Sequence, residues 1–300
     1  MGFNYWAWVA THWLLENSQV SKAASLGRQV LHVHDCDRNG KEIIQYGLSG
    51  FLSESSTINL PFADEAYFNH MNTIVDSIDY SDYEYADVLA DLSIPFRDND
   101  SLKSLEGCYD AVFDIGTSEH VGNCFASIEN AMRLLREGGL YVYDLPYANW
   151  MNHGLIQFCP SYFSELARTN GYELLLQFMH PTCRQGELVF AKDNISYSPR
   201  VITSIYGCIR KTGASNREVS PPVQTFCNEE PPETLSELEL QKNQNYPLFN
   251  LIHPDDFISY LDSEKSYPLH WSSWSGSRTL GDFKLFNPKQ NINDSKITIF

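Results

Sequence analysis

Short apolar runs alternate with amphipathic segments from about residue 73 onward, and this alternation limits the fold more than any other feature of the chain. Its clearest part is 109-YDAVFDIGTSEHVGN-123, where an apolar run ends at a glycine turn and Glu119 and His120 follow. Residues 125–136 then place apolar side chains on one helical face, at positions 125, 128, 131, 132, 134 and 135. Strands and helices joined by short connections predict right-handed crossovers and a largely parallel sheet.

The remaining segments extend this pattern in both directions. The predicted helices are 63–71, 125–136, which Gly138 and Gly139 follow, and 162–168. The predicted strands are 73–78, 87–91, 109–114 and 140–145, with 172–179 and 187–191 as a terminal antiparallel hairpin, and residues 25–30 are the candidate first strand and its turn. We therefore expect an α/β fold: a Rossmann-like, mostly parallel sheet with helices on both faces, a terminal hairpin and an irregular C-terminal extension.

The chain divides into three predicted regions. Residues 1–23 contain an aromatic-rich helix, and residues 24–194 form the Rossmann-like domain. An irregular polar insertion at 31–62 interrupts that domain, and so long a connection is typical of a lid or binding loop. Residues 195–300 form the C-terminal extension, in which 212–247 is rich in Pro, Ser, Glu and Asn and is predicted to be flexible.

Charge excludes two classes of partner. The chain carries 38 acidic residues against 21 Lys and Arg, for a net charge of −17. Nucleic-acid binding needs clustered basic side chains that displace counterions from phosphates, and no such cluster occurs. An anionic membrane surface is disfavoured for the same electrostatic reason.

Cysteine usage and the N-terminus indicate a cytoplasmic protein. The seven cysteines are odd in number and scattered, with no Cys-x-x-Cys pair, which favours reduced thiols over disulfides or a structural zinc site. The apolar run 5-YWAWVATHWLL-15 is too short to span a bilayer and lacks a basic region before it. We expect neither a membrane anchor nor a secretion signal.

Acidic residues stand where the predicted parallel strands end. Asp79, Asp91 and Asp114 each close one of these runs. In an open α/β sheet, ligands collect at the carboxyl ends of the strands, and ionised carboxylates accept hydrogen bonds from ligand hydroxyls and amines. The alternative for each acid is a role in a turn or a helix cap.

The order and spacing of these pieces resemble the class I S-adenosylmethionine-dependent methyltransferases. YDAVFDIGTSEHVGN with ASIENAMRLLREGGLYVYDLP resembles that family's fourth strand, the next helix and the fifth strand. Residues 75-VDSIDYSDYEYADVLADLSIP-95 resemble its second and third strands. Residues 149-NWMNHGLIQFCPSYFSELARTNGYEL-174 resemble a bacterial subgroup with a His-Gly…Gln-Phe…Pro signature. The resemblance covers about residues 24–192.

The resemblance assigns a set of positions to the cofactor S-adenosylmethionine. Asp79 would accept hydrogen bonds from the ribose hydroxyls, and Asp91 with Leu92 would flank the adenine. Asp114 and Gly116 would line the methionine end. The whole set is Gly27, Arg28, Asp79, Tyr80, Ser81, Asp91, Leu92, Asp114 and Gly116.

The turn after the first strand departs from the family pattern. The family has Gly-x-Gly-x-Gly there, whereas this chain has Leu26-Gly27-Arg28-Gln29, as the bacterial subgroup does. Fewer glycines restrict the approach of a ligand to the backbone, and Arg28 would then bond the cofactor carboxylate. The alternative is a non-catalytic Rossmann-fold binding protein that has lost the cofactor site. The absence of Gly-x-Gly-x-x-Gly argues against a dinucleotide oxidoreductase.

Methyl transfer to a hydroxyl or amine needs an aligned nucleophile and removal of a proton. The candidate bases are His153, then His120, then Glu119. Their alternative roles are a turn cap for His153 and a helix start for Glu119. Some relatives use a divalent ion, but no third ligand at suitable spacing is evident, so no metal is predicted. The expected acceptor is a small, sugar-linked or secondary-metabolite molecule.

Overall fold

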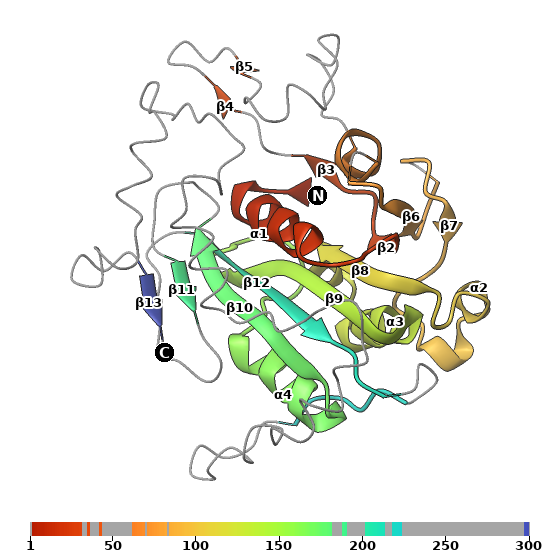
Figure 1. Ribbon diagram of the computed structural model, residues 1–300. Coiled ribbons are helices and arrows are strands. Elements are labelled where there is room, and N and C mark those ends of the chain that lie inside the picture. Colours follow the sequence, from red (N-terminus) through yellow and green to blue (C-terminus); the bar gives the residue numbers. More distant parts are fainter. Residues whose placement is uncertain are drawn as a thin grey trace.

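The computed structural model describes residues 2–31, 35–36, 42–43, 62–69, 71–82, 84–181, 188–190, 202–213, 218–223 and 297–299. Most of the insertion predicted at 31–62 and of the segment predicted to be flexible at 212–247 lies outside the described residues. The described strands form one nine-stranded sheet and two small two-stranded sheets (Figure 1).

Seven strands of the large sheet carry its topology. They are β2 (Lys22–Leu26), β6 (Ile74–Asp79), β7 (Val88–Leu89), β8 (Tyr109–Ile115), β9 (Leu135–Ala148), β10 (Glu173–Pro181) and β12 (Thr203–Arg210). Numbered along the chain, their order across the sheet is 3-2-1-4-5-7-6. The pairings β7–β6–β2–β8–β9 are parallel, and β12 runs antiparallel to both β9 and β10. The expected mostly parallel sheet is confirmed.

The strands beyond β10 include the predicted hairpin. β11 (Leu188–Phe190) pairs antiparallel with β10, as expected, and β13 (Ile297–Ile299) pairs parallel with β11. The small sheets pair β1 (Gly2–Phe3) with β3 (Val30–Leu31), and β4 (Asp35–Cys36) with β5 (Glu42–Ile43).

One predicted boundary was wrong. Residues 203–210 were placed in the C-terminal extension, but they form β12 inside the sheet, so the fold continues past residue 194. The polar composition after residue 194 concealed this strand, whose side chains pack into the cores on both faces of the sheet. The first strand begins earlier than predicted, at Lys22, and ends at Leu26, where Gly27 with its left-handed φ of 69° makes the turn expected within 25–30.

Helices cover both faces of the sheet, as expected. α1 (Tyr5–Glu16) confirms the aromatic helix and, with the π-helix η1 (Asp64–Phe68), packs on one face (Figure 1). α3 (Cys124–Leu134) and α4 (Pro160–Asn170) pack on the other. The short helices are η2 (Phe96–Asp98), α2 (Asp100–Lys103) and η3 (Ser118–His120). None of the described helices is long and apolar enough to cross a membrane.

α3 ends at Leu134, and β9 begins at the next residue, so the helix ends two residues before the predicted end at residue 136. The buried Lys211 ammonium explains the early end, since it donates to the carbonyls of Met132 at 2.6 Å and Leu135 at 2.9 Å. These carbonyls belong to the last helical turn and the cap, which need external donors.

Lys211 predicts a pH dependence of stability. Burial lowers the pKa of its ammonium from 10.5 to about 8. Between about pH 8 and pH 10.5 the unfolded chain keeps a proton that the folded chain has released, so the free energy of unfolding rises with pH, by up to about 3 kcal/mol. Urea unfolding at several pH values should show this slope in the wild type and lose it in Lys211→Met, while the exposed Lys103→Met keeps it. An equal slope in Lys211→Met would contradict the assignment.

Candidate active site at the carboxyl edge of the sheet

The turn after β8 is held by a buried acid. Asp114 accepts hydrogen bonds from Ser118 N at 3.1 Å, from Ser118 Oγ, and from the Tyr141 hydroxyl at 2.8 Å. Burial raises the pKa of this carboxyl. Gly116 adopts a φ of 78° and donates its N–H to Asp144 O at 2.9 Å. Asp114 was predicted to line the methionine end, but its enclosed carboxylate instead fixes the start of η3.

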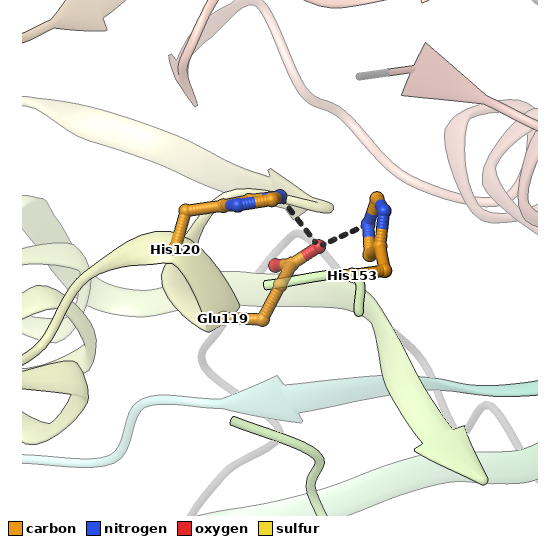
Figure 2. A group of neighbouring side chains, drawn as sticks. All are labelled: Glu119, His120 and His153. Carbon is orange, nitrogen blue, oxygen red and sulfur yellow. Dashed lines mark ion pairs between the residues drawn. The ribbon is translucent and has the colours of Figure 1, made fainter. Parts of the chain in front are cut away.

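Three predicted catalytic residues meet just past this turn. Glu119 and His120 belong to η3, and His153 comes from the loop that follows β9 (Figure 2). The carboxylate lies between the two imidazoles, with Oε1 at 3.6 Å from His120 Nε2 and 3.7 Å from His153 Nε2. The imidazole rings contact each other edge to face, with centroids 5.0 Å apart.

The loop after β9 is fitted tightly against η3. Asn149, Asn152 and Gly154 all have positive φ values, from 61° to 67°. Leu155 N donates to Glu119 O at 2.7 Å. A Cβ on Gly154 would lie 2.8 Å from Glu119 Cγ, so only glycine allows this approach. The loop therefore sets the position of Glu119 as well as that of His153.

The electrostatics of this cluster follow from burial. The Glu119 side chain is 1% exposed, and its Oε2 accepts no hydrogen bond from any described residue. Burial, together with the negative charge of Asp114, raises the pKa of Glu119 to about 8. Burial and the neighbouring His153 lower the pKa of His120. Both imidazoles are part-exposed, so this buried acid lies beneath a surface that solvent reaches.

Gly27 and Asp79 come together at the ends of β2 and β6. Gly27 N donates to Ile78 O at 2.7 Å, and a Cβ on Gly27 would lie 3.7 Å from Asp79 Oδ2. Asp79 Oδ1 accepts from Tyr80 N at 2.6 Å and from Ser81 N at 3.4 Å. Oδ2 takes no hydrogen bond from the described residues, so it is available to a ligand hydroxyl.

Arg28 and Gln29 have protein partners. The Arg28 guanidinium pairs with Asp64 at 3.0 Å, donates to Glu84 O at 2.9 Å and lies 4.0 Å from the Phe62 ring centroid. Gln29 Nε2 donates to Leu26 O at 2.7 Å and to Thr117 Oγ1 at 3.3 Å. Asp64 and Glu84 therefore anchor the Arg28 side chain, which was expected to contact a cofactor carboxylate.

The predicted adenine positions lie in a separate turn. Asp91 accepts from Ser93 N at 2.9 Å and from Ser93 Oγ at 2.6 Å, which closes a local turn. Leu92 is buried, and its carbonyl accepts from Asn130 Nδ2 at 3.1 Å. Ala90 N donates to Asp79 O at 2.9 Å, which ties this turn to the end of β6.

A buried network at the end of β9 was missed by the sequence reasoning. Asp144 accepts from Asn4 Nδ2 at 2.6 Å and pairs with His180 Nε2 at 2.8 Å. Asn4 is also the N-cap of α1, where its side chain accepts from Ala7 N. Asp144 lies near the end of the apolar run 140–145, so the sequence already showed an acid near this edge of the sheet. Its partners, Asn4 and His180, are remote in sequence, so the contacts could not be predicted.

No protein-family model and no curated protein matches this chain. A Burkholderia thailandensis 1,6-didemethyltoxoflavin-N1-methyltransferase, with bound 1,6-didemethyltoxoflavin and S-adenosylhomocysteine, is 13% identical over 69% of this chain and 77% of its own, with a TM-score of 0.40. The [4+2]-cyclase SpnF is 10% identical over 68% and 80%, with a TM-score of 0.40. The StiE O-methyltransferase domain is 12% identical over 69% and 75%, with a TM-score of 0.36.

The strand order 3-2-1-4-5-7-6, with the seventh strand antiparallel, decides the architecture. This is the class I methyltransferase fold. A fold of this kind hosts more than one reaction, so the function must come from the residues at the strand ends.

Proposed function

We propose that this protein transfers a methyl group from S-adenosylmethionine to a hydroxyl or amine of a small, sugar-linked or secondary-metabolite acceptor. The observation that carries the proposal is the placement of two groups at one edge of this sheet. Gly27 and Asp79 lie side by side at the ends of β2 and β6. Glu119, His120 and His153 lie past the ends of β8 and β9 at the same edge.

The residues at β2 and β6 fit a nucleoside. Asp79 Oδ2 would accept hydrogen bonds from the ribose hydroxyls, because an ionised carboxylate only accepts. Tyr80 and Ser81 stand next to it and are exposed, and Asp91 with Leu92 would flank the adenine. Gly27 and Gly116, both with positive φ, would leave room at the methionine end. The cofactor supplies an electrophilic methyl group on a sulfonium, and the chain holds the acceptor in line with it.

The cluster of Glu119, His120 and His153 would face the acceptor. Its part-exposed imidazoles lie above a carboxylate that is withdrawn from water. His153 remains the first candidate to accept the acceptor's proton, followed by His120 and Glu119.

A non-catalytic Rossmann-fold binding protein is the second candidate, and one observation favours it. A Cβ on Gly27 would meet Thr117 Oγ1 at 2.9 Å, and Gln29 fills the space beside it. Because Arg28 is already paired with Asp64, the turn after β2 offers a cofactor fewer hydrogen-bonding groups than the Gly-x-Gly-x-Gly turn of the family does.

Calorimetry with S-adenosylmethionine tests the proposal. We expect the wild type to bind, and we expect Asp79→Ala to lower the affinity about tenfold to a hundredfold, since a hydrogen bond to a charged group contributes about 1.5–3 kcal/mol. The control is Asp82→Ala, which removes an exposed acid from the same loop and should leave the affinity unchanged. Failure of the folded wild type to bind at millimolar cofactor would support the binding-protein alternative.

A further inference from the structure

Glu119, His120 and His153 are side chains of the kinds that ligate metals. Within the described part of the chain they are the one group of three such residues whose donor atoms all lie within 4.8 Å of one another. They come from two segments, η3 and the loop after β9, which the sheet brings together (Figure 2). Their spacing in sequence gave no sign of a three-ligand site.

Direct bonding within the cluster does not account for this arrangement. The distances of 3.6 and 3.7 Å from Glu119 Oε1 to the two imidazole nitrogens are too long for hydrogen bonds. Glu119 Oε2 is buried and accepts nothing from the described residues. A buried carboxyl group without donors either takes up a proton, in keeping with the raised pKa of Glu119, or is satisfied by a cation beside it, for which the two imidazoles supply the further ligands.

The spacing suits a shared cation. Donor atoms around a tetrahedral zinc ion are about 3.4 Å apart, given metal–ligand bonds of about 2.0–2.1 Å. The separations of 3.6 and 3.7 Å exceed this by a few tenths of an ångström, and all three donor atoms lie within 4.8 Å of one another. Rotation of the part-exposed imidazole side chains would bring the two nitrogens and the carboxylate to metal–ligand distance. Two imidazoles with one carboxylate suit Zn²⁺ and its first-row neighbours, whereas Mg²⁺ and Ca²⁺ favour oxygen ligands alone.

We propose that Glu119, His120 and His153 bind a first-row divalent metal ion and leave one coordination position open. With the metal bound, their ligand atoms do not serve as the general base, and water takes the acceptor's proton. The two imidazole side chains are 38% and 39% exposed, so the outer side of the site faces solvent. Three protein ligands with an open position are the arrangement of catalytic metal sites, whereas structural sites are closed by four. Gly154 fixes the carboxylate ligand, because its backbone lies against the Glu119 side chain.

The open coordination position also favours one class of methyl acceptor over another. This conclusion rests on the proposed function. An amine bound to the metal would use its one lone pair and could not attack, whereas a bound hydroxyl oxygen keeps a lone pair after it loses its proton to water. In that reaction the acceptor oxygen forms a bond to the methyl carbon, the carbon–sulfur bond breaks, and its electron pair passes to sulfur. A metal at this site therefore favours hydroxyl acceptors over amines.

The metal site is tested by titrating Zn²⁺ into the chelator-treated full-length protein, without cofactor, in a calorimeter. We expect one site of micromolar affinity or better, weakened at least thirtyfold in Glu119→Gln, His120→Gln and His153→Gln. His12→Gln is the matched control, because His12 pairs with Glu16 at 3.3 Å on α1, away from the cluster. The far-ultraviolet circular dichroism spectrum of each variant shows whether it is folded.

Two further measurements separate the parts of the inference. Acetohydroxamate, an oxygen ligand, should shift the visible absorption bands of the Co²⁺-loaded protein if a position is open; no shift would refute the open position. S-adenosylmethionine binding by the wild type is measured separately. Because the Zn²⁺ titration needs no cofactor, failure of the cofactor to bind would refute the proposed function and leave the metal site standing. Equal Zn²⁺ affinity in the wild type and in all three cluster variants, or no Zn²⁺ binding by the folded wild type, would overturn the proposal.

Discussion

Replacing Gly207 by alanine is expected to destabilise the protein by about 3 kcal/mol, the cost of forcing atoms into a packed core. Gly207 lies in β12 directly opposite Tyr143 of β9 and Gln177 of β10. The Tyr143 ring crosses over Gly207, and its hydroxyl donates to Gln177 Oε1 at 2.7 Å. A Cβ on Gly207 would lie 2.8 Å from Tyr143 Cε2 and closer still to Cζ and the hydroxyl oxygen.

The Tyr143 ring has no room to retreat. It is fully buried and stacks on Phe163 of α4, with ring centroids 3.7 Å apart. The new methyl group would therefore displace either the ring or β12 itself. Because β9 leads into the loop that carries His153, a shift there would also disturb the Glu119–His120–His153 cluster.

Urea unfolding of Gly207→Ala measures the effect. The control is Gly122→Ala, where an added Cβ would meet no atom within 4 Å and the stability should change little. In Tyr143→Ala, the further change Gly207→Ala should cost much less than in the wild type, because the clash is absent. A loss below about 0.5 kcal/mol in Gly207→Ala alone would show that the strands adapt freely.

Replacing Asp144 by alanine is expected to cost about 3 kcal/mol, because it leaves the buried His180 ring nitrogen and the Asn4 amide without their partner. Asp144 and His180 are both buried, and their side chains are 2.8 Å apart. Asn4 donates to the second oxygen of the same carboxylate at 2.6 Å, so the change also loosens the start of α1. A surface pair would cost far less, since solvent screens it.

The free energy of unfolding of Asp144→Ala, measured in urea, checks this expectation. Asp144→Asn should lose less, because the amide keeps the shape and an acceptor oxygen. The control is Asp100→Ala, which breaks the exposed pair with Lys103 and should leave stability nearly unchanged. Equal effects of Asp144→Ala and Asp100→Ala would mean that the buried network contributes nothing specific.

Local patterns in the sequence were sufficient to predict most helices and strands and the edge of the sheet at which ligands collect. Period-2 and period-3.6 patterns located β6, β8, α3 and α4, because side-chain burial repeats with the geometry of each element. Polar residues at strand ends identified Asp79, Glu119 and His120 as residues of the carboxyl edge, since parallel strands end at one edge. The sequence also identified His153, as the leading candidate base, without showing that it meets Glu119.

The side-chain partners of these residues became known only from their contacts in the folded protein. Arg28 turns to Asp64, Asp114 is enclosed by Ser118 and Tyr141, and Asp144 pairs with His180. The tertiary structure also places β12 in the sheet and Lys211 at the end of α3. Most of these contacts join segments that are distant in sequence, and the pattern of one segment does not predict its contacts with the other. Pairing across the sheet depends on packing and register, which no periodicity within a single segment records.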